Sequence, residues 1–256
     1  MTTTLLTGAS GVLGSHLHAR MLAAGRRVIA TDIRAAGDGR DVVEADLGDA
    51  DAVDRLVKGA DAIVHFGAVS NEQNWPLIQA ANIEGTRNIF ESARRHGVGR
   101  VIFASSYHVM GFHPTRDTPI RLDAPVRPDT MYGVSKVFGE SYGRYCYDRY
   151  GIQCLVVRIC TAYPPKSSRD ARNFCDRDDL ARLVDCGLDL PDLGFRTVYA
   201  LSDNPNPFFV NEPDPGLGWK PQASSRAFPE VVPDGEIDLD EPVNRVVGGA
   251  FALPRP

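Results

Sequence analysis

A tyrosine and a lysine stand four residues apart in the segment MYGVSKVFGE (residues 131–140), at Tyr132 and Lys136. In a helix, two residues at this spacing lie on the same face, so the ammonium group would sit one turn from the phenol. A phenol, with a pKa of roughly 10, is a poor base at neutral pH, but a neighbouring cation favours its ionised form. The pair could therefore transfer a proton. Because ordinary amphipathic helices show the same spacing, the rest of the chain has to decide.

The elements that would position this pair appear as alternating hydrophobic patterns over the first 160 residues. Short apolar or β-branched runs predict buried parallel strands at residues 3–7, 26–32, 61–67, 100–106 and 152–159. Helical patterns lie between them, at residues 11–25, 51–59, 76–97 and 130–151, and each ends at a glycine. This alternation predicts an α/β fold, a doubly wound parallel sheet (Rossmann fold) with helices on both faces.

The sequence changes character after residue 160, where most of the prolines lie. It predicts one more helix, at residues 176–188, and one more strand, at residues 196–202. We therefore expect residues 1–256 to form a single NAD-binding Rossmann domain. Within it, residues from about 161 to 256 would form a small, loop-rich cap over the carboxyl edge of the sheet and contribute to substrate binding.

Composition and charge limit the classes of partner. The formal net charge of −5 argues against a nucleic acid or an anionic membrane surface as the main partner. No apolar run approaches the roughly 20 residues that span a bilayer, and the N-terminus lacks the pattern of a signal peptide. The 5 cysteines contain no C-x-x-C pair, which indicates a reduced, cytoplasmic location rather than a disulfide framework. We expect no metal site, because His65, His108 and His113 lack the spacing of ligands.

A phosphate-binding turn is predicted where the first strand meets the first helix. Gly8, Gly11 and Gly14 form a G-x-x-G-x-x-G series there, which allows a tight turn and close approach of the backbone to a diphosphate. The start of the following helix offers unpaired N–H groups to the phosphates. Asp32, at the end of the second strand, would bind a ribose diol and repel a 2′-phosphate, which favours NAD over NADP; Arg34 would soften that preference.

Two further segments extend the predicted site. Asp46 and Leu47 precede a helix and would contact the adenine, although a helix-capping role for Asp46 explains the residue equally well. Ser105 and Ser106 follow a buried strand and therefore emerge at the carboxyl edge of the sheet, where ligands bind in open α/β folds. A serine, a tyrosine and a lysine thus converge beside a dinucleotide site, which favours the chemical interpretation of Tyr132 and Lys136.

With these motifs the chain resembles the extended branch of the short-chain dehydrogenase/reductases, the NAD-dependent epimerase/dehydratase family. The matching segments are TGASGVLG, ADL, HFGA, NIEGT, ASS and YGVSK, together with Asp32. The resemblance implies that Tyr132 is the catalytic acid/base, that Lys136 lowers its pKa and holds the nicotinamide ribose, and that Ser106 binds the reacting oxygen. It implies cofactor contacts at Gly8, Ser10, Gly11, Val12, Leu13, Gly14, Asp32, Ile33, Asp46, Leu47, Phe66, Gly67, Ala68, Asn82, Tyr132, Lys136 and Ile159. For Asn82, an amide that bonds to nearby backbone is the favoured alternative.

Other segments are similar to a narrower group, the bacterial NAD-dependent uronate dehydrogenases. They are GAVSNEQNWPLIQAANIEGTRNIFESARRHGV, SSYHVMGF, LGWKPQASSRAF and the terminal VVGGAF. The likeness implies oxidation of the anomeric carbon of galacturonate or glucuronate to an aldarolactone. It also implies substrate contacts at Ser70, Ser106, Tyr107, Tyr132 and Arg169, of which Arg169 would pair with the carboxylate; Arg172 competes for that role. Tyr107 departs from the group, which usually has asparagine there.

Alternative functions remain open at this point. A dehydrogenase of a neutral aldose or another small hydroxy compound comes second, a nucleotide-sugar epimerase third, and a non-catalytic NAD-sensing regulator last. Fewer than 100 residues follow the sheet core, which disfavours the epimerase. The likeness also implies a homo-oligomer, a dimer or larger, formed through the helices at residues 76–97 and 130–151. Tyr142, Tyr145, Tyr147 and Tyr150 would pack against the sheet or against a partner helix.

Overall fold

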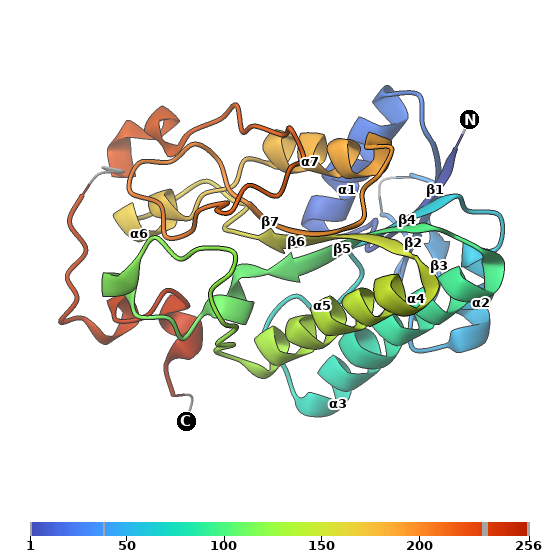
Figure 1. Cartoon of the computed structure of the whole chain (residues 1–256), viewed down its shortest axis with the longest axis horizontal. Helices are drawn as coiled ribbons and strands as arrows, with labels where there is room; N and C mark the ends of the chain where they lie inside the picture. The colour runs from blue at the N-terminus through green and yellow to red at the C-terminus, as the bar shows by residue number, and fades with distance from the viewer. Residues whose placement is uncertain (1, 38, 232–234, 255–256) are drawn as a thin grey trace.

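The computed structural model describes residues 2–37, 39–231 and 235–254, and its centre is a seven-stranded sheet (Figure 1). All neighbouring strands pair in parallel, in the order β3-β2-β1-β4-β5-β6-β7. The strands are β1 (Thr3–Thr7), β2 (Arg27–Asp32), β3 (Val43–Glu44), β4 (Ala62–His65), β5 (Arg100–Ser106), β6 (Gln153–Ile159) and β7 (Phe195–Ala200). The predicted doubly wound parallel sheet is therefore confirmed.

Helices cover both faces of the sheet. In Figure 1, α1 and α7 lie on one face, and α2, α4 and α5 lie on the other. The helices are α1 (Val12–Ala23), α2 (Ala50–Val57), α3 (Trp75–Ile78), α4 (Gly85–His96), α5 (Met131–Tyr150), α6 (Ser168–Arg172) and α7 (Arg177–Asp189). A π-helical segment, η1 (Gln79–Glu84), joins α3 to α4, so the helix predicted at residues 76–97 is continuous but not α-helical throughout. Six 3₁₀ turns complete the described elements: η2 (Tyr107–Met110), η3 (Thr115–Asp117), η4 (Ser225–Ala227), η5 (Pro229–Val231), η6 (Pro242–Asn244) and η7 (Gly249–Ala252).

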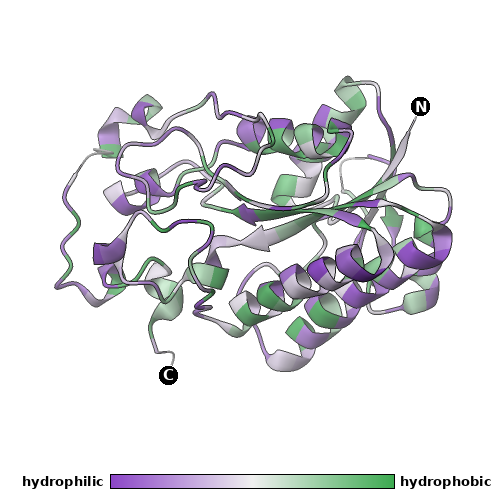
Figure 2. Cartoon of the chain, in the orientation of Figure 1, coloured by the Kyte–Doolittle hydropathy of each residue, from purple (hydrophilic) through white to green (hydrophobic). Residues whose placement is uncertain are grey.

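The strands divide their side chains between two apolar cores. Leu6 and Val64 face the core under α1 and α7, whereas Leu5 and Ile63, one residue earlier, face the core under α2, α4 and α5. Successive residues of a strand point to opposite faces, so a strand covered on both sides reads as a continuous apolar run. On the helices the pattern is different: hydrophobic and hydrophilic residues alternate along α4 and α5, because only one side of each helix faces the sheet (Figure 2).

Glycines end the helices as the sequence predicts. Gly97 and Gly151 adopt left-handed backbone angles, φ 71° and 73°, immediately after α4 and α5. Two elements were absent from the prediction: β3 at the sheet edge and α6 in the C-terminal part. Each has so few residues, 2 and 5, that it shows no hydrophobic period, and only tertiary pairing reveals it.

The C-terminal part both completes the sheet and covers one end of it. Its α7 and β7 belong to the central layers, while the remaining chain runs as loops and 3₁₀ turns. Residues near the C-terminus return to the loop after β5: the Val247 N–H donates to the His113 carbonyl (2.9 Å) and the Gly248 N–H to the Gly111 carbonyl (2.8 Å). Within the described residues, no helix combines the length and the apolar character needed to cross a membrane.

Candidate active site

A pocket of about 870 Å³ opens at the carboxyl ends of the strands. It lies where the strand order reverses, between β1 and β4, which is where open α/β sheets bind ligands. The pocket brings together nearly all of the side chains and backbone that the sequence singled out. Those that line it are Gly8, Ser10, Gly11, Val12, Leu13, Gly14, Asp32, Ile33, Asp46, Leu47, Phe66, Gly67, Ala68, Ser70, Ser106, Tyr107, Tyr132, Lys136 and Ile159.

The glycine turn fits a diphosphate. Gly8 has φ +74°, and a Cβ there would lie 2.7 Å from the backbone of Gly67. A Cβ on Gly14 would overlap the Gly8 carbonyl, so the loop and α1 can approach this closely only without side chains. Helix α1 begins after Gly11 with no side-chain cap and no acidic residue in its first turn. Its N–H groups and positive dipole end are therefore available to an anion in the pocket.

Two carboxylates lie at the adenosine end of the pocket. An oxygen of Asp32 accepts a hydrogen bond from the Ser10 N–H (2.9 Å), which ties the end of β2 to the glycine turn. Asp46 accepts a hydrogen bond from the Gly48 N–H (2.8 Å) and lines the pocket. The helix-capping role considered for Asp46 belongs instead to Asp49, whose side chain accepts from two N–H groups of α2. Asp46 is thus placed beside the pocket and not at the cap.

A buried histidine fixes the backbone where β1 and β4 separate. His65 Nδ1 is hydrogen-bonded to the Thr7 hydroxyl (2.8 Å) and Nε2 to the Thr86 hydroxyl (3.2 Å). The Thr7 oxygen also accepts from the Gly67 N–H (2.9 Å) at the pocket wall. Burial, and secondarily the charge of Lys136, lowers the pKa of His65 to about 3, so the ring is neutral at neutral pH. His65 acts here as a structural link between two strands and α4.

The tyrosine and lysine lie one turn apart on the face of α5 that meets the pocket. Both are buried; Lys136 Nζ donates to the Ala104 carbonyl (2.8 Å) and lies 5.6 Å from the centre of the Tyr132 ring. Burial raises the pKa of Tyr132 to about 12, although its hydrogen bond with Ser106 acts in the opposite direction. Burial lowers the pKa of Lys136 to about 8. Among the protein's own groups, therefore, burial outweighs the lysine and leaves the phenol less acidic than usual, contrary to the expectation from the lysine alone.

The start of α5 is held by two side chains. Thr130 is the N-cap and accepts from the Gly133 N–H (2.9 Å). Glu72, from the loop after β4, accepts from the Met131 N–H (3.3 Å) and the Tyr132 N–H (2.9 Å). A carboxylate at this position also interacts favourably with the positive end of the helix dipole. The first turn of α5, which carries Tyr132, is thereby attached to the loop that carries Ser70.

Asn82 does not line the pocket. Its amide oxygen accepts from the Val69 N–H (2.8 Å), and its nitrogen donates to the Val69 carbonyl (3.0 Å) and to the Ser135 hydroxyl (2.9 Å). The two bonds to Val69 agree with the alternative favoured from the sequence, an amide that bonds to nearby backbone. In place of the predicted position in the cofactor pocket, the amide holds the backbone of Val69, the residue before Ser70, because its hydrogen-bonding groups are taken up there.

The two candidate arginines also lie outside the pocket lining. Arg169 donates from Nη2 to the carbonyls of Val246 (2.8 Å) and Val247 (2.5 Å). Its Nη1 is buried and makes no hydrogen bond among the described residues. Arg172 donates to the Gly235 carbonyl (2.9 Å). The returning C-terminal segment supplies these carbonyls, and sequence spacing could not reveal that contact.

Tyr107 is a pocket residue that lies close enough to Arg169 for the two to interact electrostatically. Its side chain lines the pocket, and its ring centre lies 4.2 Å from that of His108. Burial raises the pKa of the Tyr107 phenol, and the charge of Arg169 partly opposes this. Tyr107 therefore contributes a neutral, partly buried side chain to the pocket wall.

Several lining residues were not among the predicted site residues. His108, whose Nδ1 is hydrogen-bonded to the buried Asp129 (2.8 Å), and Phe251 both lie within segments that carried the resemblance, SSYHVMGF and VVGGAF. The match of these two segments to the uronate dehydrogenases could therefore have identified His108 and Phe251 as site residues. Tyr163 and Arg177 also line the pocket, but nothing in their spacing distinguishes them from ordinary loop and helix-start residues.

Comparison with known proteins agrees with this geometry. Residues 4–188 match the NAD dependent epimerase/dehydratase family. The uronate dehydrogenase of Pseudomonas syringae pv. tomato is 42% identical over 98% of this chain and 94% of that protein. Two crystal structures superpose over 98% of this chain. Glucuronic acid dehydrogenase from Chromohalobacter salexigens has TM-score 0.92, 38% identity and 96% of its chain covered. A mutant uronate dehydrogenase from Agrobacterium tumefaciens complexed with NAD has TM-score 0.90, 34% identity and 97% covered. The resemblance is confirmed: this chain belongs to the NAD-dependent epimerase/dehydratase family.

Proposed function

We propose that this protein is an NAD-dependent uronate dehydrogenase. It oxidises the anomeric carbon of a hexuronic acid, galacturonate or glucuronate, to an aldarolactone and reduces NAD. The observation that carries the proposal is a single pocket that runs from the glycine turn to Ser106, Tyr132 and Lys136, in a chain that matches uronate dehydrogenases over 98% of its length.

The residues of the pocket fit NAD. Backbone N–H groups at the start of α1 face the diphosphate position, Asp32 would receive the adenosine ribose hydroxyls, and Lys136 would hold the nicotinamide ribose. Asp46 and Leu47 would lie against the adenine. When bound, NAD supplies the acceptor for the hydride that leaves the substrate carbon.

Tyr132 takes the proton of the anomeric hydroxyl. Ser106, which ends β5 beside it, donates a hydrogen bond to the same substrate oxygen and so orients it toward the phenol. Because burial alone raises the pKa of Tyr132 to about 12, the phenolate needs nearby positive charge. Lys136, with a pKa of about 8, is protonated at neutral pH and supplies part of that charge; the oxidised nicotinamide supplies the rest.

The substrate end is formed by Ser70, Tyr107 and the residues around them. We propose that Ser70 binds a sugar hydroxyl and that Arg169 attracts the carboxylate. The buried Nη1 of Arg169 makes no hydrogen bond among the described residues and is a spare donor, and Arg169 interacts electrostatically with the pocket residue Tyr107. Arg172 is the weaker candidate, since its side chain points to the Gly235 carbonyl.

The surroundings of Arg169 and Tyr107 also support a second candidate function. Arg169 is held by two carbonyls and does not line the pocket, and Tyr107 presents a neutral wall. These features favour a neutral aldose or another small hydroxy compound, with the same cofactor and the same catalytic residues.

We further propose that residues 1–256 act as one domain, because α7 and β7 belong to the same layers as the helices and strands of the N-terminal part.

We also propose that the protein forms a homo-oligomer through α4 and α5. Met131, Val134 and Tyr145 leave 43–52% of their area exposed along α5. Tyr142 instead packs on Phe90 of α4 (ring centres 5.9 Å apart). We propose a cytoplasmic location because all 5 cysteines are free thiols, as is usual in a reducing compartment.

A substrate panel tests the proposal. Purified protein is mixed with NAD and either galacturonate, glucuronate, glucose or arabinose, and NADH absorbance is followed. Turnover of the uronates well above that of the neutral sugars is expected. Turnover of neutral sugars alone would reject the carboxylate assignment and leave the second candidate.

A further inference from the structure

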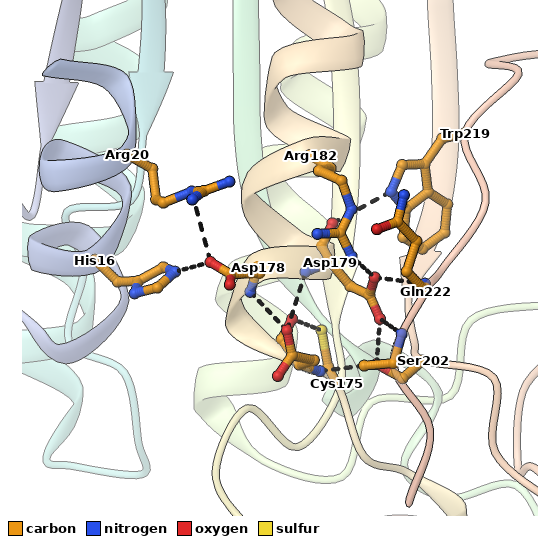
Figure 3. A network of polar contacts seen from close by, with 11 residues as sticks. His16, Arg20, Cys175, Asp178, Asp179, Arg182, Ser202, Trp219 and Gln222 are labelled. Atoms are coloured by element: carbon orange, nitrogen blue, oxygen red, sulfur yellow. Dashed lines mark hydrogen bonds and ion pairs between the residues drawn. The ribbon is translucent and has the colours of Figure 1, made fainter. Parts of the chain in front are cut away.

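The first turn of α7 is rigidly held by polar contacts (Figure 3). Asp176 is the N-cap, and its side chain accepts from the N–H groups of Asp178 (2.8 Å) and Asp179 (3.3 Å). The Asp176 N–H donates in turn to the Ser202 hydroxyl, just after β7 (2.9 Å). The helix start is therefore fixed to the end of β7 by the protein's own hydrogen bonds.

Asp178 attaches this turn to α1. In Figure 3 its carboxylate is turned toward two α1 side chains, His16 at 2.8 Å and Arg20 at 3.5 Å. His16 stands one turn after Val12, the first residue of α1. The start of α7 consequently lies next to the first turns of the helix whose uncapped end faces the diphosphate position.

Asp179 attaches the turn to the C-terminal segment. Its fully buried carboxylate accepts from the Ser202 hydroxyl (2.7 Å) and from the N–H groups of Gln222 (2.7 Å) and Ala223 (3.1 Å). Arg182 also donates to this carboxylate. All three aspartates of the turn are therefore engaged with neighbours other than Arg177.

Arg177, the residue between them, lines the pocket. Its Nε donates to the carbonyl of Ala162 (3.2 Å), which also lines the pocket. For the part of the chain that the structure describes, its two terminal nitrogens make no hydrogen bond or ion pair. A cation placed so by a rigid helix start, without an anionic partner, is ready for an anionic ligand.

We propose that Arg177 binds the diphosphate of the dinucleotide from the side opposite the glycine turn. The inference rests on the proposed NAD-dependent function and adds to it a second, side-chain half of the diphosphate site. The glycine turn offers backbone N–H groups on one side, and Arg177 offers paired N–H donors and a full charge on the other. The link from Asp178 to α1 favours the diphosphate over the substrate carboxylate, because it places Arg177 by the start of α1.

Calorimetric titration tests this without turnover. Arg177→Gln and Arg177→Lys are compared with wild type for the binding of NAD, ADP-ribose and adenosine. Arg20→Gln is the matched control, since it removes an arginine that contacts the same turn but does not line the pocket. We expect Arg177→Gln to weaken NAD and ADP-ribose roughly tenfold, as for loss of one charge-assisted hydrogen bond. Arg177→Lys should weaken them less, and adenosine affinity should not change.

Three results would overturn the inference: unchanged affinity for NAD, an equal loss for adenosine, or a raised KM for uronate with NAD affinity intact. The last would assign Arg177 to the substrate carboxylate. Melting temperatures of the variants check that the fold is kept, and Arg177→Lys covers the case in which Arg177→Gln fails to fold. If no uronate is oxidised while the NAD pattern holds, the proposed substrate fails and this inference stands.

Discussion

At the scale of single residues, burial governs the proton chemistry of the site. The Tyr132 phenol and the Lys136 ammonium are both removed from water, which disfavours the charged form of each: the pKa of Tyr132 is raised to about 12 and that of Lys136 is lowered to about 8. If NAD binds as proposed, the positive charge of its oxidised nicotinamide would lower the pKa of the Tyr132 phenol in this buried environment, where electrostatic effects are large. Cofactor binding and ionisation of Tyr132 would then be linked.

Replacing Tyr132 by phenylalanine tests the role of the hydroxyl. Because the substitution removes only the proton acceptor, we expect the turnover rate to fall by roughly 10²–10⁴-fold while NAD affinity stays nearly unchanged. Turnover is measured by NADH absorbance and affinity by calorimetry. Tyr163→Phe is the control, since this tyrosine also lines the pocket but lies half exposed. A Tyr132→Phe variant with the wild-type rate would remove Tyr132 from the mechanism.

At the scale of elements, loops are positioned by side chains that never enter the pocket. Asn82, in the π-helical segment, bonds to the backbone of the loop that carries Ser70, and Glu72 of that loop caps α5. On the other side of the sheet, Asp179 joins α7 to the loop after β7 and to residues 222–223. A buried polar side chain thus supports a loop on each side of the sheet, Asn82 on one side and Asp179 on the other.

Asp179→Ala should destabilise the protein strongly. The change leaves two backbone N–H groups, a hydroxyl and Arg182 without their acceptor, and breaking a buried pair costs about 3–5 kcal/mol. At about 2–4 °C per kcal/mol for a chain of this size, the melting temperature should fall by roughly 10 °C. Asp178→Ala is the control; its carboxylate is 48% exposed, so its loss should cost about 1 kcal/mol or less. Equal effects in the two variants would contradict this account.

At the scale of the whole molecule, the pocket draws on both ends of the chain. The glycine turn supplies one wall and Phe251, near the C-terminus, lines the other end. A ligand that bridges these parts binds only the folded state, so it stabilises the whole protein.

NAD at a hundredfold excess over its Kd should stabilise the protein by about 2.7 kcal/mol, and so raise the melting temperature by roughly 5–10 °C. Differential scanning calorimetry measures the shift. NADP at the same concentration should give a smaller one, because Asp32 repels a 2′-phosphate. If NADP shifts the melting temperature as far as NAD does, the discrimination assigned to Asp32 is wrong.

The sequence by itself determined the fold class, and it predicted the glycine turn and the Tyr132–Lys136 pair that the structure places in one pocket. These follow from local order: the alternation of strand and helix, the glycines between β1 and α1, and the spacing of Tyr132 and Lys136 on one helix face all lie within short segments. The positions of Asp32 and Ser106 follow as well, since the carboxyl ends of parallel strands meet at one edge of the sheet.

Tertiary structure alone decided how distant segments meet. Arg169 is turned away from the pocket by carbonyls 77 and 78 residues further along the chain. Asn82 became a support of a loop, and Arg177 was brought to the pocket by contacts of its neighbours with α1 and residues 222–223. Hydrophobic periodicity specifies which face of a helix or strand is buried. The partner of a polar side chain depends instead on which distant segment packs against it, and residue spacing does not contain that information.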